Sequence, residues 1–144
     1  MSEKNRYLSQ NREDTIAYAK KLGESLVGGE VIAFYGDLGT GKTTFVQGLA
    51  QGLGVKETVN SPTFVIMKLY DLKNEKIKKF CHIDTYRLNN SQELDDLGVE
   101  EYWQENNTVS AVEWAEKVED MLPQNCIRIR LKSLGEKKRE IIIE

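Results

Sequence analysis

Residues 36–43 read Gly-Asp-Leu-Gly-Thr-Gly-Lys-Thr, a full match to the phosphate-binding pattern G-x-x-x-x-G-K-[ST]. Glycines let successive backbone N–H groups turn toward one point, where the following helix also presents its positive end. In such a loop Lys42 bridges the β- and γ-phosphates, and the Thr43 hydroxyl ligates Mg²⁺. The pattern therefore predicts a site for a nucleoside triphosphate with Mg²⁺, and it does not indicate what the nucleotide is used for.

Two acidic residues that directly follow apolar runs are candidates for the rest of the metal site. Asp84 follows residues 78–83 and Glu113 follows residues 108–112. Phosphate-loop sites take an acidic residue from the end of a neighbouring strand to complete the Mg²⁺ shell. We assign Glu113 to that shell, directly or through water. We assign Asp84 either to holding the metal ligands in place without touching the metal or to orienting the attacking water. The sequence leaves open which carboxylate lies closer to the metal.

Two further segments carry polar candidates. Ser61 and Thr63 lie in the irregular segment after the loop helix, where nucleotide hydrolases often place a switch that senses the γ-phosphate. Thr63 could donate to the γ-phosphate or to Mg²⁺, although an ordinary proline turn explains the same residues. Tyr86 and Arg87 follow Asp84. An arginine there could pair with Asp84, touch phosphate or contact a partner, and the residues alone do not choose.

The hydrophobic pattern indicates the elements that must position these side chains. Apolar or alternating runs predict strands over residues 31–35, 64–70, 77–83, 108–112, 127–132 and 140–144, the second and third forming a hairpin. Helical spacing and capping residues predict helices over 11–26 and 43–51, one opened by Asn90 with Glu93, and one over 114–122. We expect an α/β fold: a single P-loop NTPase domain over residues 1–144, with a central parallel sheet extended by antiparallel edge strands.

Composition and charge narrow the classes of partner. The net charge of −3 comes from 20 Lys plus Arg against 23 Asp plus Glu, so the overall field attracts neither nucleic acid nor anionic lipid. The basic residues of the last strands indicate a solvated face rather than an RNA surface. No apolar run approaches the roughly 18 residues needed to span a bilayer, so we expect no membrane contact and a cytoplasmic location.

Four single side chains have simple structural interpretations. Cys81 and Cys126 lie in separate apolar runs without C-x-x-C spacing, which predicts buried reduced thiols rather than a disulfide or a zinc site. His82 is the only histidine, and we expect an ordinary satisfied strand residue that is neither base nor ligand. Trp114 follows Glu113, and large aromatic side chains more often fill the core than act in a site.

Other nucleotide-binding classes fit less well. A guanine-specific GTPase normally shows an N-K-x-D motif, and no Asn-Lys pair occurs in this chain, so adenine is the better expectation. A small-molecule kinase for a nucleoside or metabolite stays possible because residues 84–88 could hold a substrate. A kinase lid carries several arginines, however, and residues 85–107 supply only Arg87. A nucleotide-sensing module without useful turnover is the third alternative.

Four blocks resemble one family, the ATPase subunit of bacterial tRNA threonylcarbamoyladenosine biosynthesis, TsaE, formerly YjeE. The blocks occur in the family's order and spacing and span about residues 35–123. They read YGDLGTGKTTF, SPTF, IDTYRL followed by ELDDLGVEEYW, and VEWAEKVEDMLP. Together these blocks are far more specific than the phosphate loop alone.

The resemblance implies a weak ATPase, with ATP and Mg²⁺ as its cofactors, that assists two larger proteins of actin-like, sugar-kinase-like fold. One of these transfers a threonylcarbamoyl group to the adenosine beside the anticodon of tRNAs that read codons beginning with A, so tRNA would be a partner only indirectly. Hydrolysis coupled to such partners suits a domain with no second pocket. ATP binding and hydrolysis would then shift switch residues between two arrangements that the partners read.

The resemblance also assigns residues. Its nucleotide-binding loop falls on Asp37, Leu38, Gly39, Thr40, Gly41, Lys42, Thr43 and Thr44. Catalytic roles fall on Lys42, Thr63, Asp84 and Glu113, and metal binding falls on Thr43 and Glu113. Partner or switch roles fall on Ser61, Tyr86, Arg87 and Trp114. The C-terminal third departs into a generic strand pattern, so the resemblance identifies no adenine contacts there.

Overall fold

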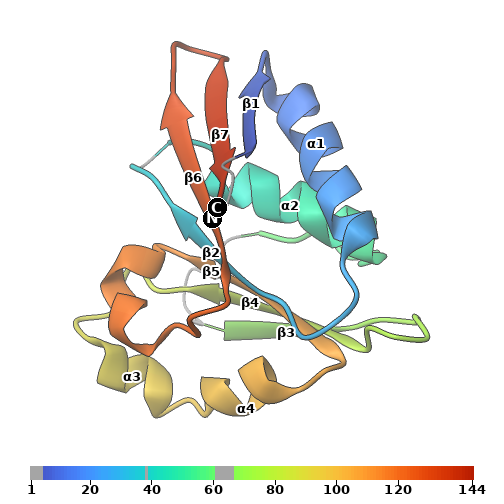
Figure 1. The fold of residues 1–144 in the computed structure, drawn as a ribbon, viewed down its shortest axis with the longest axis vertical. Helices are drawn as coiled ribbons and strands as arrows, with labels where there is room; N and C mark the ends of the chain where they lie inside the picture. Colours follow the sequence, from blue (N-terminus) through green and yellow to red (C-terminus); the bar gives the residue numbers. More distant parts are fainter. Residues whose placement is uncertain (1–4, 38, 61–66) are drawn as a thin grey trace.

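A seven-stranded sheet with helices on both faces organises the chain (Figure 1). The structure, a computed structural model, describes residues 5–37, 39–60 and 67–144. The strands are β1 (Asn5–Ser9), β2 (Val31–Tyr35), β3 (Met67–Asp71), β4 (Lys79–Asp84), β5 (Thr108–Glu113), β6 (Ile127–Ser133) and β7 (Arg139–Ile143). The helices are α1 (Arg12–Ser25), α2 (Lys42–Leu53), α3 (Ser91–Asp95), α4 (Val99–Gln104) and the 3₁₀ helix η1 (Ala115–Met121).

The sheet is parallel at its centre and antiparallel at both edges. Its order is β1-β7-β6-β2-β5-β4-β3, with β6, β2, β5 and β4 running parallel to one another. β7 and β1 extend one edge in antiparallel pairing, and β3 pairs antiparallel with β4 at the other. The topology confirms the predicted α/β arrangement, including the hairpin, whose residues 64–66 lie outside the described part of the chain.

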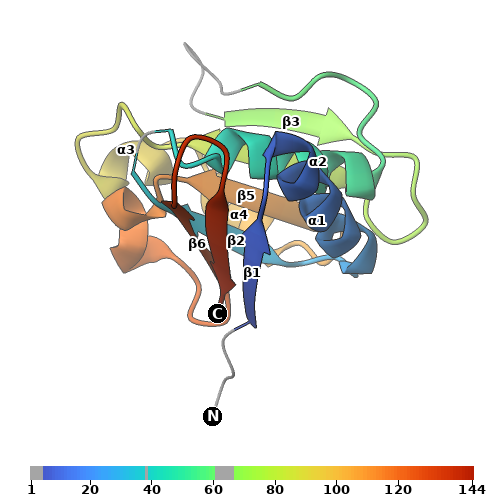
Figure 2. The same cartoon turned by 90° about the horizontal axis from the view of Figure 1, so that it is seen from above.

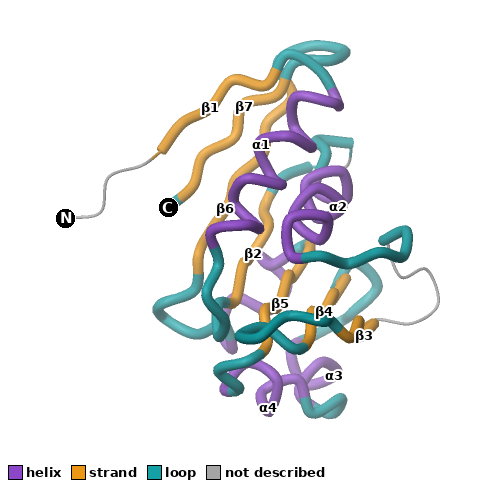
Figure 3. Tube along the Cα trace, turned by 90° about the vertical axis from the view of Figure 1, so that its right-hand side faces the viewer, coloured by secondary structure: helices purple, strands orange, loops and turns teal. Residues whose placement is uncertain are grey.

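The central strands are buried because helices cover both faces. All five residues of β2 and all six of β5 are buried. Alternate side chains such as Phe34 and Ala111 join the core under α1 and α2, whereas Ala33 and Val112 join the core under α3, α4 and η1. Figures 1 and 3 show the α1–α2 pair and the α3–α4 pair on opposite sides of the sheet. The face that a side chain takes therefore decides whether it meets α2.

α1 supports α2 through a close helix–helix contact. The Asn11 side chain accepts a hydrogen bond from the backbone N–H of Asp14 at 2.8 Å, which confirms the predicted start of α1. A Cβ at Gly52 would lie 2.2 Å from the carbonyl oxygen of Lys20, and one at Gly48 would lie 2.6 Å from that of Ile16. Glycine at these two positions lets the backbones approach and fixes where α2 lies over the sheet.

Three element predictions differ from the structure. β1 was not predicted, because its exposed pattern NRYLS lacks a buried alternation; β1 gains its strand form by pairing with β7 at the edge (Figure 2). The helix opened by Asn90 is two short helices, and Leu97 in the turn between them is 44% exposed. The helix predicted over 114–122 is the shorter 3₁₀ helix η1.

Candidate functional site

The Gly-rich loop joins the end of β2 to the start of α2, at the carboxyl edge of the parallel strands. Gly41 is the N-cap of α2 and has φ 98°, a left-handed conformation that favours glycine. Gly36 has φ 148°, and a Cβ there would lie 2.6 Å from the carbonyl oxygen of Leu131. The loop thus bends without steric cost and directs the first turn of α2 toward the ends of β5 and β4. Leu38 lies outside the described residues.

Lys42 is folded back on its own loop. Its side chain is buried, and Nζ donates to the carbonyl oxygens of Gly36 at 2.5 Å and of Asp37 at 2.9 Å. The same Nζ lies 3.8 Å from the centroid of the Trp114 ring. Burial lowers the pKa of Lys42, although the surrounding carboxylates oppose this effect. The loop therefore holds a buried cation at its centre.

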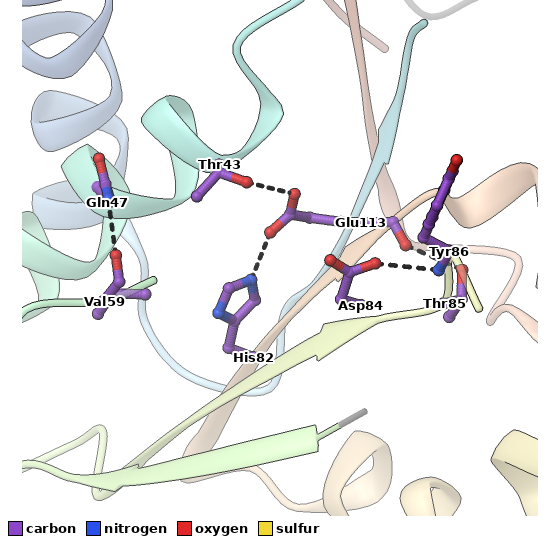
Figure 4. Close-up of polar contacts among 8 residues, drawn as sticks. All are labelled: Thr43, Gln47, Val59, His82, Asp84, Thr85, Tyr86 and Glu113. Carbon is purple, nitrogen blue, oxygen red and sulfur yellow. Dashed lines mark hydrogen bonds and ion pairs between the residues drawn. The ribbon is translucent and has the colours of Figure 1, made fainter. Parts of the chain in front are cut away.

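Glu113 joins α2 to the sheet. The Thr43 hydroxyl donates to Glu113 Oε1 at 2.8 Å, and the Nε2 atom of His82 lies 2.5 Å from Glu113 Oε2 (Figure 4). Register explains this meeting, since β4 and β5 pair His82 with Ala111 and Asp84 with Glu113, on the face that α2 covers. Sequence reasoning missed the role of His82 as a partner of Glu113, because the contact depends on pairing between strands.

Asp84 lies beside this cluster with different partners. Asp84 Oδ1 accepts from the backbone N–H of Tyr86 at 3.0 Å (Figure 4). Burial raises the pKa of Asp84, and the nearby Glu113 carboxylate raises it further. Thr85 donates from Oγ1 to the backbone carbonyls of Glu113 at 2.9 Å and Trp114 at 2.7 Å, which fixes the end of β5. Of the two predicted carboxylates, Glu113 is the one hydrogen-bonded to Thr43.

Trp114 covers Lys42 in an unusual backbone conformation. Its φ of 59° is left-handed, and no other non-glycine residue in the described ranges has a positive φ. The indole also contacts the half-exposed ring of Tyr86, with 5.0 Å between centroids. Trp114 is thus half-buried at the site rather than in the core that its size predicted. Trp114 thus contacts both Lys42 and Tyr86, and Arg87 is exposed on the adjoining turn.

A cavity of about 380 Å³ opens beside the loop. It is lined by residues of the loop and of the strand end (Gly39, Gly41, Lys42, Thr43, Thr44 and Glu113), by Arg12 and Thr15 of α1, and by Glu136, Lys137 and Arg139. The Arg139 guanidinium donates to the carbonyl of Gly39 at 3.2 Å. Sequence reasoning missed Arg12 altogether and treated the basic residues near Arg139 as solvated, because only the folded chain brings the β6–β7 turn and α1 to the loop.

The structure tests the remaining site predictions only in part. Asp37, Gly39, Thr40 and Thr44 lie in or next to the loop, with Thr40 donating from Oγ1 to the carbonyl of Asp37 at 2.8 Å. Ser61 and Thr63 lie outside the described residues. Within the described ranges, no group of three or more His, Cys, Asp or Glu side chains is arranged to hold a metal ion. Oxygen atoms of Thr43 and Glu113 are nevertheless adjacent, a pair that suits a hard cation such as Mg²⁺.

The topology and this site define an α/β protein that carries a Gly-Lys-Thr loop between a buried parallel strand and its helix. The chain belongs to the TsaE family, described as threonylcarbamoyl adenosine biosynthesis protein TsaE, whose profile matches residues 9–141. This finding confirms the resemblance carried by the four sequence blocks.

Individual relatives agree with the family match. The chain is 44% identical over 131 residues to the tRNA threonylcarbamoyladenosine biosynthesis protein TsaE of Bacillus subtilis, covering 91% of this chain and 79% of that protein. It is 35% identical to the protein of the same name from Treponema pallidum, covering 96% and 98%. The crystal structure of Bacillus subtilis YdiB superposes with a TM-score of 0.77 at 35% identity, covering 99% of this chain and 86% of that one. No helix in the described ranges is long and apolar enough to cross a membrane.

Proposed function

We propose that this chain is a single P-loop NTPase domain that binds ATP with Mg²⁺ in the 380 Å³ cavity and hydrolyses it slowly. The observation that carries the proposal is the hydrogen bond from the Thr43 hydroxyl to Glu113. It joins the last residue of the loop motif to the acidic residue at the end of the neighbouring strand. A phosphate loop requires these two groups to meet at the metal.

The donor set fits Mg²⁺. Thr43 and Glu113 present a hydroxyl and a carboxylate, and Mg²⁺ prefers oxygen ligands and keeps several of its waters. Two protein oxygens are therefore enough where nucleotide phosphates and water supply the rest, which agrees with the lack of a larger acidic cluster in the described ranges. When bound, Mg²⁺ neutralises charge on the phosphates during transfer.

Lys42 supplies the main protein cation. Its ammonium now donates to the carbonyls of Gly36 and Asp37, so two of its three N–H donors are held by weak neutral acceptors. Phosphate oxygens are stronger, charged acceptors, and we expect Lys42 to exchange the two carbonyls for them. The N-terminal backbone N–H groups of α2 add the positive end of the helix at the same place.

Asp84 and Thr63 complete the proposed catalytic set. Asp84 is half-buried next to Glu113 and its Oδ1 is already engaged by Tyr86. We assign Asp84 to orienting the attacking water, and we keep Thr63 as a donor to the γ-phosphate and Ser61 as part of the same switch. Both latter roles remain predictions from the sequence.

Lining residues outside the loop are candidates to bind the rest of the nucleotide. Arg12 and Thr15 from α1 and Arg139 from the start of β7 line the same cavity as the loop. We assign the ribose and base to these residues, and we favour adenine because the sequence lacks an Asn-Lys pair.

The biological role proposed for the ATPase follows its family. The relatives are named for tRNA threonylcarbamoyladenosine biosynthesis. We propose that the chain is the accessory subunit of the complex that makes this modification in tRNAs reading codons that begin with A. Its partners would be two larger proteins of actin-like, sugar-kinase-like fold, with tRNA reached through them. Tyr86, Arg87 and Trp114 are the proposed contact or switch residues, and a cytoplasmic location stays a prediction.

One observation supports the alternative of a small-molecule kinase. A second hollow of about 650 Å³ lies on the other side of the loop, lined by Asp37 and Thr40 together with Arg130 and Lys132 of β6. The domain therefore has a second pocket, contrary to the sequence-based expectation. An acceptor molecule could occupy it, in which case ATP consumption would require that molecule.

Two measurements test the proposal. Phosphate release from ATP by the purified chain should depend on Mg²⁺ and fall at least about tenfold in Thr43→Val, which keeps the side-chain shape and removes the hydroxyl. The matched control Thr58→Val changes an exposed threonine and should hydrolyse ATP normally. Reconstitution with the two partner proteins, ATP and tRNA should then give repeated cycles of modification. If adding this chain does not increase tRNA modification by the partner proteins, the accessory role is wrong, while the ATPase proposal is unaffected.

A further inference from the structure

His82 is the one histidine of the chain, and its ring lies wholly inside the protein. It projects from β4 onto the face covered by α2 and is 0% exposed. Its ring contacts the Phe80 ring, with 6.3 Å between centroids and 19° between planes. Packing and strand register therefore hold the imidazole in place.

The two ring nitrogens of His82 have different environments. Nε2 lies 2.5 Å from Glu113 Oε2, while Nδ1 is buried without a hydrogen-bond partner among the described residues. A buried N–H without an acceptor costs more than a buried lone pair facing apolar neighbours. The proton therefore belongs on Nε2, which donates it to the Glu113 carboxylate (Figure 4).

The hydrogen bond from His82 restricts the Glu113 carboxylate, whose side chain is only 2% exposed. One carboxylate oxygen accepts from Thr43 and the other accepts from His82. A carboxylate held at both oxygens cannot rotate about its last bond without breaking one of two charge-assisted hydrogen bonds. The hydrogen bond from His82 to Oε2 therefore fixes the orientation of Oε1, the oxygen that accepts from Thr43.

We propose that His82 is the positioning residue of Glu113: its Nε2–H orients the carboxylate so that Thr43 and Glu113 present their oxygens together to Mg²⁺. This inference rests on the proposed function, since it concerns the same metal site. His82 itself touches neither the metal nor the nucleotide. Loss of His82 should weaken the Mg²⁺ dependence of nucleotide affinity, because residues hydrogen-bonded to a metal ligand typically change metal affinity by about 10–100-fold.

Two substitutions separate positioning from packing. His82→Gln places an amide N–H within reach of the carboxylate, whereas His82→Met has similar bulk and no donor. Cys81→Ala is the matched control, because Cys81 is buried on the same strand and faces the opposite core. Thermal unfolding of each variant reports any loss of stability separately.

The binding experiment uses the full chain and a fluorescent ATP analogue, titrated with Mg²⁺ and again in EDTA. We expect His82→Met to raise the Mg²⁺ concentration for half-maximal enhancement of binding about tenfold, with affinity in EDTA within about twofold of wild type. His82→Gln should recover most of the loss, and Cys81→Ala should match wild type. A His82→Met variant with wild-type Mg²⁺ dependence, or equal defects in His82→Met and His82→Gln, would overturn the inference.

Nitrogen NMR of the nucleotide-free chain provides a readout that is independent of activity. Because the chain has one histidine, ¹⁵N-histidine labelling reports only His82. We expect one protonated and one unprotonated ring nitrogen, with the protonated Nε2 resonance shifted in Glu113→Gln. An Nδ1–H tautomer would overturn the inference. If Mg²⁺ does not change nucleotide affinity in the wild-type chain, the proposed function is wrong. The NMR result tests the His82 inference separately, because it needs no nucleotide.

Discussion

Replacing Glu113 by glutamine tests the link between the loop and the sheet. The change keeps the side-chain shape, so it leaves no cavity in a position that is 2% exposed. It removes the charge that Thr43 and His82 now contact. Truncation to alanine would add unpaired donors and an empty volume, and it would confuse a loss of metal binding with a loss of folding.

The expected stability change follows from two hydrogen bonds. In Glu113→Gln the amide oxygen can still accept from His82, while the amide NH2 can only donate, so the Thr43 hydroxyl must accept instead. Each bond that loses its charged partner is weakened by about 1 kcal/mol, so the two together give a loss of at most about 2 kcal/mol. Relief of the buried charge offsets part of that loss. At about 3 °C per kcal/mol for a chain of this size, Tm should fall by no more than about 6 °C. The variant should therefore be folded at room temperature.

The expected loss of activity is larger. Without its carboxylate the site loses the anionic oxygen next to Thr43, and we expect Mg²⁺-dependent ATP hydrolysis to fall at least about 100-fold, equivalent to about 2.7 kcal/mol in the barrier. Phosphate release at saturating ATP and calorimetric unfolding measure the two effects, with Glu100→Gln on the exposed face of α4 as the matched control. Wild-type turnover by a folded Glu113→Gln variant would refute the role assigned to this residue.

Three further predictions concern other parts of the molecule. Burial raises the pKa of Asp84, so the ionised carboxylate destabilises the folded chain at pH values above that pKa. Asp84→Asn should therefore be more stable than wild type at pH 7, and this advantage should disappear below the ordinary aspartate pKa of 3.8. In the same variant the rate of ATP hydrolysis should fall more than the affinity for the nucleotide. Gly52→Ala should destabilise the chain by about 1–3 kcal/mol in urea unfolding, because its Cβ would lie 2.2 Å from a backbone carbonyl of α1, whereas the exposed Gln51→Ala should change little. Burial raises the pKa of Cys81 to about 12 and also raises that of Cys126, so a thiol reagent at pH 8 should modify the native chain slowly and the unfolded chain fully; rapid native labelling would contradict their burial.

The sequence predicted the parts of the fold that depend on local pattern. The apolar run at 31–35 indicated a strand, and helical spacing with a capping residue indicated the helix that begins after Asn11. Alternating or apolar runs indicated the last two strands, which pair antiparallel at the edge of the sheet. β1 could not be predicted in this way, since it is a strand only through its pairing with β7.

The candidate site was predictable where a motif carries it and unpredictable where strands bring residues together. The loop identified Lys42 and Thr43, and apolar runs pointed to Asp84 and Glu113 as strand ends. The bond between Glu113 and His82 depends instead on the register of β4 against β5, which nothing local specifies. Arg139 likewise reaches the loop only because β6 and β7 form a hairpin beside it.

The most direct test of the central claim is phosphate release from ATP by the purified chain, measured with Mg²⁺ and with EDTA, for wild type and for Lys42→Ala. Lys42 is the buried cation that the loop holds at its centre. We expect slow Mg²⁺-dependent release by wild type, with ATP affinity and release both lost in Lys42→Ala. Equal affinity and equal release in the two proteins would contradict the proposal that this loop binds the triphosphate.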